Sequence, residues 1–287
     1  MKITITLSDS HPTTTIRELL EQEWLVPRKV RHFLRIRKNV WINKKPALFH
    51  FEVCAGDHIT LHFEDSDYQY QEVQLGEASF IQSLYEDEHL IIVNKPTGMK
   101  THPNAPTEKD TLLNHLAAYL LKKEQRPYVV HRLDKETSGA ILFAKNPFVL
   151  PILGRMLEQK KIYRRYQALV WGTMRHDMTF NDKIGRDRHD RRKRVVDNKH
   201  GQSALTHVYV DQVLNNQTKI YCVLETGRTH QIRVHLSYHG HPIVGDPLYQ
   251  NQSDKRLMLH ALELHMIHPF TQEKIIGQAL PALWNSP

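Results

Sequence analysis

The order of the short apolar segments after residue 80 constrains the fold more than any other feature. Strand-like segments occur at 89–98, 140–144, 166–171, 205–213, 219–225 and 257–266. Apolar residues with helical spacing are confined to 110–122, 147–159 and 229–239. Because several strands follow one another directly, the chain cannot alternate strand and helix as a doubly wound parallel sheet does. We therefore expect an α+β fold with a mixed, largely antiparallel central sheet.

The first 63 residues predict a smaller α+β unit in front of this sheet. An amphipathic helix is expected over 14–24, capped by Thr13 or Thr14, and a second helix starts at Pro27 and runs to about residue 38. Strands are expected at 2–7, 40–42, 48–53 and 58–63, with a turn at 43–46. The polar, aperiodic segment 64–79 is an expected linker. This divides the chain into a module at 1–63, the linker at 64–79 and a larger domain at 80–287.

The second of these helices has a basic outer face. Val30, Phe33 and Leu34 have the spacing of an inward stripe, whereas the cations are expected to point outward: Arg28, Lys29, Arg31, Arg35, Arg37 and Lys38. The whole chain has a formal charge of +8 and a pI near 9.3. Neutralised phosphates supply most of the sequence-independent affinity for nucleic acid. The charge therefore favours a polyanionic partner without establishing one.

Several classes of protein are disfavoured by what the sequence lacks. No run approaches the roughly 18 consecutive apolar residues of a membrane span, and the N-terminus has no apolar signal core. We expect a cytoplasmic protein with no membrane partner and, by default, a monomer. No glycine-rich phosphate-binding motif opens a helix, which disfavours a nucleotide cofactor. His230, His235, His239 and His241 lie close in sequence without an HExxH-like element, so neither a metal nor another cofactor is expected.

The segment HRLDKETSG (131–139) gives the strongest functional signal. Asp134 lies in an expected turn at the mouth of the sheet, where an aspartate is most often a local turn residue. The full segment resembles the signature of the RluA-type family of large-subunit ribosomal RNA pseudouridine synthases. Further family segments are NKPTG (94–98), RRYQALVWG (164–172) and GRTHQIRVHLSYHGHPIVGDPLY (227–249). The resemblance spans about residues 80–264 and implies a pseudouridine synthase fold.

This resemblance implies that Asp134 is the catalytic residue. Converting uridine to pseudouridine breaks the N1–C1′ bond and forms a C5–C1′ bond without gain or loss of atoms, so an ionised carboxylate near the ribose is required. The sequence leaves open whether Asp134 adds at C1′ or removes a C2′ proton. By family position, Arg233 favours the charged form of this carboxylate, and Tyr166 stacks on the extruded uracil. Further expected substrate contacts are Arg132, His131 and Ile232.

The resemblance also implies two RNA-binding segments. The family has a basic hairpin where this chain has KIGRDRHDRRKRVVDNK (183–199), and the cations expected to meet phosphates there are Arg186, Arg188, Arg191 and Arg192. Gln202 departs from the lysine that the family generally has, which puts one backbone contact in doubt. Residues 1–63 resemble the S-four-like RNA-binding module in helix order, the VWINKKP turn and the GDHITLHF strand. In that module the basic helix faces RNA.

Large-subunit ribosomal RNA is the expected substrate, with transfer RNA as an alternative. A second alternative is an RNA-binding protein that kept the fold and lost activity. The combination of Asp134, Tyr166 and Arg233 disfavours it, because a carboxylate beside bound phosphates only repels them. A third is a hydrolase acting on nucleotides through Asp134, which would release a free base or phosphate.

Overall fold

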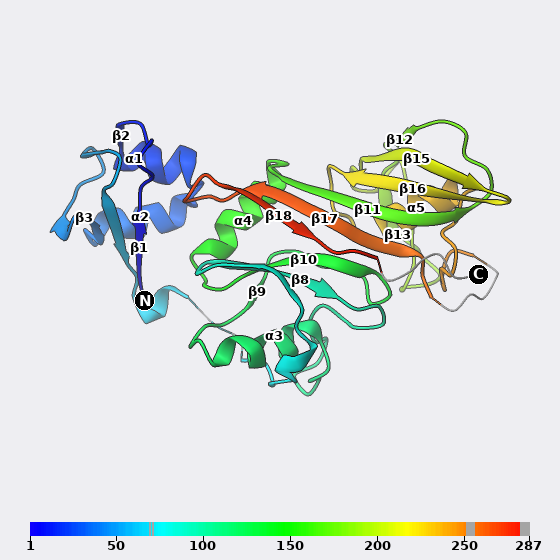
Figure 1. Ribbon diagram of the computed structural model, residues 1–287, viewed down its shortest axis with the longest axis horizontal. Coiled ribbons are helices and arrows are strands. Elements are labelled where there is room, and N and C mark those ends of the chain that lie inside the picture. The colour runs from blue at the N-terminus through cyan, green and yellow to red at the C-terminus, as the bar shows by residue number, and fades with distance from the viewer. Residues whose placement is uncertain (69, 71, 251–255, 282–287) are drawn as a thin grey trace.

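The computed structural model describes residues 1–68, 70, 72–250 and 256–281. Figure 1 shows an elongated molecule with the N-terminal unit at one end of its long axis and a long, twisted sheet filling the rest. In the N-terminal unit the strand order is β1-β6-β3-β4, and β2 pairs with β5. The strands are β1 (Lys2–Thr6), β2 (Thr14–Thr15), β3 (Val40–Ile42), β4 (Lys45–Pro46), β5 (Glu52–Val53) and β6 (His58–His62), and the helices are α1 (Ile16–Glu18), the π-helical η1 (Leu19–Glu23) and α2 (Arg28–Ile36).

The structure corrects three details of the predicted N-terminal unit. The cap of the first helix is Thr15, not Thr13 or Thr14, because Glu18 stands three residues later and completes a capping box with it. Residues 45–46, predicted as a turn, form β4 on the edge of the sheet, where the missing N–H of Pro46 is tolerated. Of the strand predicted at 48–53, the pairing is confined to β5.

The large sheet has the strand order β12-β15-β16-β11-β17-β10-β8-β7, with β18 added to β17 and β9 to β10. All its pairings are antiparallel except that of β10 with β17, so the mixed, largely antiparallel α+β sheet is confirmed. Its strands are β7 (Ser83–Glu86), β8 (Leu90–Lys95), β9 (Tyr128–Val129), β10 (Ser138–Ala144), β11 (Ile162–Trp171), β12 (Met178–Phe180), β15 (Thr206–Leu214), β16 (Gln217–Leu224), β17 (Leu259–Ile267) and β18 (Lys274–Gln278). A separate hairpin pairs β13 (Ile184–Arg186) with β14 (Arg194–Val196).

Alternating side chains of the central strands divide the core between the two faces of the sheet. On β8, Leu90 and Ile92 belong to one hydrophobic cluster, whereas Ile91 and Val93 belong to another. Helix α4 (Val149–Glu158) packs into the first cluster and α3 (Leu112–Leu121) into the second. The third helix of this part, α5 (Gln231–Tyr238), also contributes to the second cluster. The three helices lie where the sequence predicted them.

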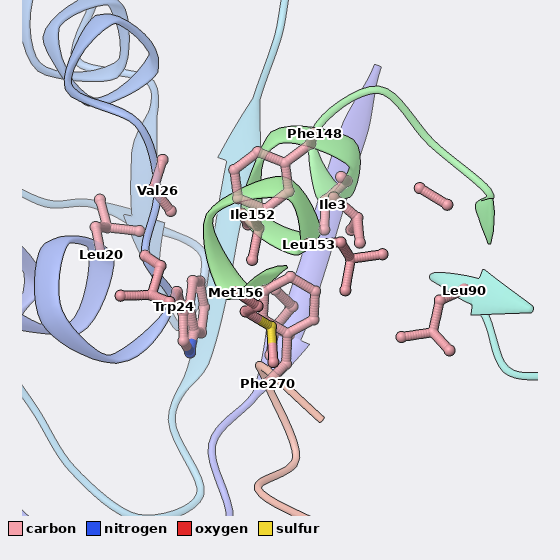
Figure 2. Close-up of a cluster of buried hydrophobic side chains, with 14 of the residues drawn as sticks. Ile3, Leu20, Trp24, Val26, Leu90, Phe148, Ile152, Leu153, Met156 and Phe270 are labelled. Atoms are coloured by element: carbon pink, nitrogen blue, oxygen red, sulfur yellow. The ribbon is translucent and has the colours of Figure 1, made fainter. Parts of the chain in front are cut away.

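The N-terminal unit shares one hydrophobic cluster with the rest of the molecule. Figure 2 shows Leu20, Trp24 and Val26 facing the side chains of α4. The indole ring of Trp24 also lies against Phe270, with ring centroids 5.1 Å apart in an edge-to-face arrangement. Arg155 of α4 adds a polar contact between the two parts, because its Nη1 donates hydrogen bonds to the main-chain oxygens of residues 25 and 26 at 3.0 and 3.2 Å. The unit is therefore packed onto α4 and not merely tethered to it.

The predicted linker contains two short 3₁₀ turns, η2 (Asp65–Asp67) and η3 (Ala78–Phe80), and no strand among its described residues. Positions 69 and 71 of this segment lie outside the described residues, as do positions 251–255 and 282–287 of the predicted larger domain. Within the described ranges, none of the helices has the length and apolar character needed to cross a membrane.

Candidate active site

Asp134 lines a cavity of about 680 Å³ between the end of α4, the loop 130–137, the loop 224–230 and the start of α5. Its carboxylate is 18 % exposed, so it is partly shielded from water but still reachable. The loop that carries it connects β9 to β10 and turns back through a hydrogen bond from the Thr137 N–H to the Asp134 carbonyl oxygen. The turn predicted from HRLDKETSG is thus observed, and it presents the carboxylate to the cavity.

The end of β8 and the segment after it, residues 95–101, hold the loop of Asp134 in place. The Thr101 hydroxyl donates to the Leu133 carbonyl oxygen at 2.8 Å and accepts from the Leu133 N–H at 3.2 Å. The fully buried ammonium of Lys95 donates to three carbonyl oxygens, those of Pro96, Met99 and Lys135. Within the NKPTG segment, Lys95 and Thr97 thus support the loop of Asp134, Thr97 by donating from its hydroxyl to the Glu136 carbonyl oxygen, and neither residue lines the cavity.

Arg233 bridges two carboxylates beside this cavity. Its Nη1 donates to Asp134 Oδ2 at 3.1 Å, while Nε and Nη2 form a bidentate pair with Asp246, both at 2.8 Å. Burial disfavours the charge of the guanidinium, but the hydrogen bonds and charge of Asp246, followed by Asp134, raise the pKa of Arg233 above its ordinary value. Asp246 is fully buried and was not among the expected site residues. Gly245 before it has φ +74°, a conformation that glycine adopts readily.

His230 and Tyr249 complete the surroundings of the carboxylate. His230 Nε2 lies 3.7 Å from Asp134 Oδ2, and His230 Nδ1 lies 2.9 Å from the Tyr249 hydroxyl. The Tyr249 ring also lies under the guanidinium of Arg233, 5.2 Å from its centroid. Burial lowers the pKa of His230 and raises the pKa of Tyr249 to about 12. The sequence analysis considered His230 only as a possible metal ligand and did not single out Tyr249, although both lie in the third family segment.

Tyr166 and Ile232 lie in the wall of the cavity, as expected from the motifs, and Arg132 is at its exposed rim. Tyr166 pairs with Ala261 of β17 beside a register shift, because the neighbouring Arg165 pairs with Glu263. The extra residue of this irregularity therefore lies on β17. The ring is 6 % exposed and reaches the cavity from the sheet.

His131 was expected to bind substrate, but its ring also forms a hydrogen bond within the protein. Its Nε2 accepts the N–H of Leu142 on β10 at 3.2 Å. Burial, with a contribution from Arg164, lowers the pKa of His131 to about 3, so the ring is neutral. It lines the cavity while anchoring the loop of Asp134 to the sheet.

The remaining histidines of the third segment have structural partners. His235 lies 2.9 Å from the carbonyl oxygen of Asp182, and His239 lies 2.8 Å from the carboxylate of the same residue. His241 lies 3.1 Å from the Trp171 carbonyl oxygen. Across the described parts of the chain, no three His, Cys, Asp or Glu side chains are grouped as metal ligands would be.

Arg164 is a cavity residue that sequence reasoning missed. Its side chain lines the pocket, the residue is only 9 % exposed, and its Nε has no hydrogen-bond partner among the described residues. Gly227 stands opposite, and a Cβ there would come within 3.0 Å of Arg164 Nη1. A buried cation with an unused N–H is suited to a polar or anionic ligand group. Its position at the basic start of RRYQALVWG was the available signal.

The predicted basic hairpin is formed by β13 and β14, and a second cavity of about 290 Å³ lies between it and the loop 228–229. The cationic groups on its lining are Arg186, Arg194 and Arg228, and His200 lies beside them. Gln202, where the family generally has lysine, lines the same cavity and pairs with Ile184 through main-chain hydrogen bonds. The expected RNA contacts at the hairpin are all exposed: Arg186, Arg188, Arg191 and Arg192. Of these, Arg192 is paired with Asp190 at 2.8 Å.

Helix α2 presents three of its expected RNA contacts to solvent, namely Arg28, Lys29 and Arg35. The fourth, Arg31, is half-buried and forms an ion pair with Glu21. It is therefore less available to phosphate than the other three.

The fold and this pocket define an RNA-modifying isomerase. The family of RNA pseudouridylate synthases matches residues 89–238, and the N-terminal domain of the RluD ribosomal pseudouridine synthase matches residues 3–59. The chain belongs to the RNA pseudouridylate synthase family. Both the family and the enzyme class expected from the motifs are thereby confirmed.

Among its relatives, the chain is 37 % identical over 266 residues to an uncharacterized RNA pseudouridine synthase of Bacillus subtilis (strain 168), YhcT, covering 90 % of this chain and 83 % of the relative. It is 41 % identical over 225 residues to the ribosomal large subunit pseudouridine synthase D of Nitrosomonas europaea, covering 74 % and 63 % of the two chains. Its fold is similar to that of human RNA pseudouridylate synthase domain containing 1, with a TM-score of 0.57, 25 % identity and coverage of 73 % and 86 %.

Proposed function

We propose that Asp134 carries out the pseudouridine synthase reaction on a uridine of large-subunit ribosomal RNA. The observation that carries this proposal is the ion pair of 3.1 Å between Asp134 and Arg233 at a cavity with Tyr166 in its wall. An extruded uridine would stack on Tyr166 and bring its ribose to the carboxylate. Breaking N1–C1′ and forming C5–C1′ then moves one proton from C5 of the uracil to N1. The large-subunit target is supported by the function for which the relative from Nitrosomonas is named, and it would place the enzyme in the cytoplasm.

The RNA is proposed to approach along two basic surfaces. One is the hairpin with its neighbouring cavity, which shares Arg228 and Thr229 with the pocket of Asp134. Continuity between the two cavities suits a strand whose phosphates meet arginines while one base enters the pocket. The other is the exposed face of α2 in the module of residues 1–63. Arg164 would then meet an oxygen of the extruded nucleotide.

Replacing Asp134 with Asn tests the catalytic assignment. Asp134→Asn keeps the size of the side chain, removes its charge and replaces one carboxylate oxygen with an NH₂ group, so it should abolish conversion while RNA affinity is unchanged or increased. Conversion is measured by pseudouridine-specific primer extension on 23S-type ribosomal RNA, and affinity by filter binding at fixed salt. Asp211→Asn, which removes a surface aspartate far along β15, is the matched control and should convert normally. Substantial conversion by Asp134→Asn would show that another group acts.

The target is tested by mapping pseudouridines in total RNA of cells with and without the gene. Loss confined to large-subunit ribosomal RNA is expected. Loss confined to transfer RNA would favour the alternative substrate, and release of free uracil by the purified enzyme would favour a hydrolase.

A further inference from the structure

The Tyr249 hydroxyl lies at a junction between the basic hairpin and the active site. It accepts the main-chain N–H of Arg194, in β14, at 2.8 Å. On its other side it lies 2.9 Å from Nδ1 of His230. Tyr249 belongs to the turn that also supplies Asp246, the bidentate partner of Arg233. One short segment, 246–249, therefore touches both of the side chains that flank Asp134.

Counting protons at this junction determines which nitrogen of His230 carries hydrogen. The hydroxyl has one proton to donate, and it keeps that proton because burial raises the pKa of Tyr249 to about 12. The Arg194 N–H can only be a donor, so the hydroxyl accepts there. Among the described residues, the remaining neighbour of the hydroxyl is His230 Nδ1, which must then accept its proton. The opposite arrangement would leave the hydroxyl proton without an acceptor among the described residues, which disfavours it.

His230 with an unprotonated Nδ1 and a neutral ring carries its proton on Nε2. That nitrogen is the one that faces Asp134, at 3.7 Å from Oδ2. We propose that Tyr249 is a positioning residue that fixes His230 as the Nε2–H tautomer, so that its ring donates toward the Asp134 carboxylate alongside Arg233. The inference rests on the proposed catalytic role of Asp134. It gives the Asp134 carboxylate a second N–H that faces it, at 3.7 Å and so beyond hydrogen-bond distance in this structure. It also makes the direction of that N–H depend on the hydrogen bond from the Arg194 N–H in the hairpin.

The backbone of His230 is consistent with such a fixed role. His230 has φ 58° and ψ 18°, in the left-handed region, where residues other than glycine are uncommon. It stands at the N-cap of α5, three residues before Arg233. The loop before it is held by Gln231, whose side-chain oxygen accepts from the Thr226 hydroxyl and the Arg228 N–H. Strained backbone is retained where the surroundings over-determine it, and such positions gather at functional sites.

Tyr249→Phe tests the inference, because it removes one oxygen and keeps the ring under Arg233. In ¹⁵N-histidine-labelled protein, long-range ¹H–¹⁵N correlation reports the tautomer of each neutral imidazole, and the His230 signals are assigned by their loss in His230→Gln. We expect wild-type His230 to be protonated on Nε2 and to populate the Nδ1–H form only in Tyr249→Phe. The variant should lose about tenfold in kcat with KM preserved, as for loss of one hydrogen bond to a charged group. Tyr209→Phe, at an exposed tyrosine on β15, should change neither quantity.

Two substitutions of His230 separate a donor role from a structural one. The amide nitrogen of Gln reaches the position of Nε2, whereas that of Asn reaches only the position of Nδ1. His230→Gln should therefore keep most of the wild-type kcat and His230→Asn should lose it. Asn tolerates the left-handed conformation well, so its defect would not come from misfolding.

The two proposals fail in distinguishable ways. The inference would be overturned if wild-type His230 is protonated on Nδ1, or if Tyr249→Phe alters neither the tautomer ratio nor kcat. Either result would hold whether or not Asp134 is the catalytic residue. Conversion by Asp134→Asn would overturn the catalytic assignment, while the tautomer measurement, which needs no substrate, would still stand.

Discussion

Arg233 has little freedom to serve any ligand other than Asp134. Asp246 occupies the guanidinium edge formed by Nε and Nη2, and the side chain is shielded from water. Removing one member of a buried ion pair leaves the other charged and unsolvated, which is far more costly than losing a surface pair. Asp246 also accepts the N–H groups of Leu248 and Tyr249, so it organises the turn as well.

Asp246→Ala should therefore lower the free energy of unfolding by about 3–5 kcal/mol. The matched control is Asp211→Ala, which breaks the half-exposed pair with Lys219 at 3.0 Å and should cost less than about 1 kcal/mol. Urea unfolding at pH 7 measures both. Similar destabilisation of the two variants would mean that the Arg233–Asp246 pair is not a specific support of the fold.

At this scale the sequence anticipated the groups that we propose to carry the chemistry but not the groups that support them. Asp134, Arg233 and Tyr166 meet at one cavity, as the motifs predicted. Asp246 and Tyr249 gave no local signal, because their importance arises from contacts with residues 13 to 55 positions away. A polar residue in a turn is usually a turn former, and pattern alone cannot show what its side chain reaches.

The elements were predictable where apolar spacing was regular and uncertain where it was not. Helices α3, α4 and α5 have clear stripes and were placed correctly. Strands β7 and β18 were missed. Each is short and is paired with one longer strand, β7 with β8 and β18 with β17. The π-helical turn η1 was predicted as ordinary helix because Leu19 and Leu20 bury equally well in either geometry.

The hairpin of β7 and β8 depends on the carboxylate of Asp87. It accepts from the Tyr85 hydroxyl and from the N–H groups of His89 and Leu90, at 2.7–2.9 Å, and lies 3.3 Å from His268. Burial raises the pKa of Asp87, but these hydrogen bonds outweigh it and lower the pKa to about 2 from 3.8.

A carboxyl group whose pKa is lower in the folded than in the unfolded state stabilises the folded protein at pH values above its unfolded pKa. This stabilisation is lost as the pH falls through the folded pKa. The stability advantage of wild type over Asp87→Asn should therefore be constant above pH ~5 and shrink by about 2 kcal/mol as pH falls toward 2. Urea titrations between pH 7 and pH 2 measure it. Asp9→Asn, at an exposed aspartate, is the control, and a pH-independent advantage would contradict the assignment.

At the scale of the whole molecule, the shared cluster around α4 changes how the N-terminal unit can be studied. Deleting residues 1–63 would uncover Ile152, Met156 and Phe270, which are buried in that cluster. Each large apolar side chain exposed in this way costs roughly 1.5–3 kcal/mol. Deleting residues 1–63 should therefore destabilise the rest of the protein. Weak RNA binding by such a truncated protein would not show whether a lost RNA contact or a damaged fold is the cause.

Charge reversal avoids this difficulty. Arg28→Glu/Lys29→Glu/Arg35→Glu changes exposed side chains of α2 and should leave the thermal midpoint unchanged while weakening RNA binding. The slope of log affinity against log salt should become shallower by about 0.7–0.9 for each phosphate that the variant no longer neutralises. Lys109→Glu/Lys122→Glu/Lys274→Glu changes the net charge equally at other exposed sites. Equal effects of the two triple variants would show that α2 makes no specific contact.

Helix α4 touches the N-terminal unit through Ile152 and Met156 and lines the pocket of Asp134 through Gly154 and Leu157. Both contacts are made by the same helix, α4, which lies between the N-terminal unit and the large sheet in Figure 1. With RNA bound on α2, the enzyme would select a uridine by its distance from the bound nucleotides. The span between the bound nucleotides and the reacting uridine would be fixed in space, so the fold of the RNA, more than its sequence, would decide which uridine comes within reach.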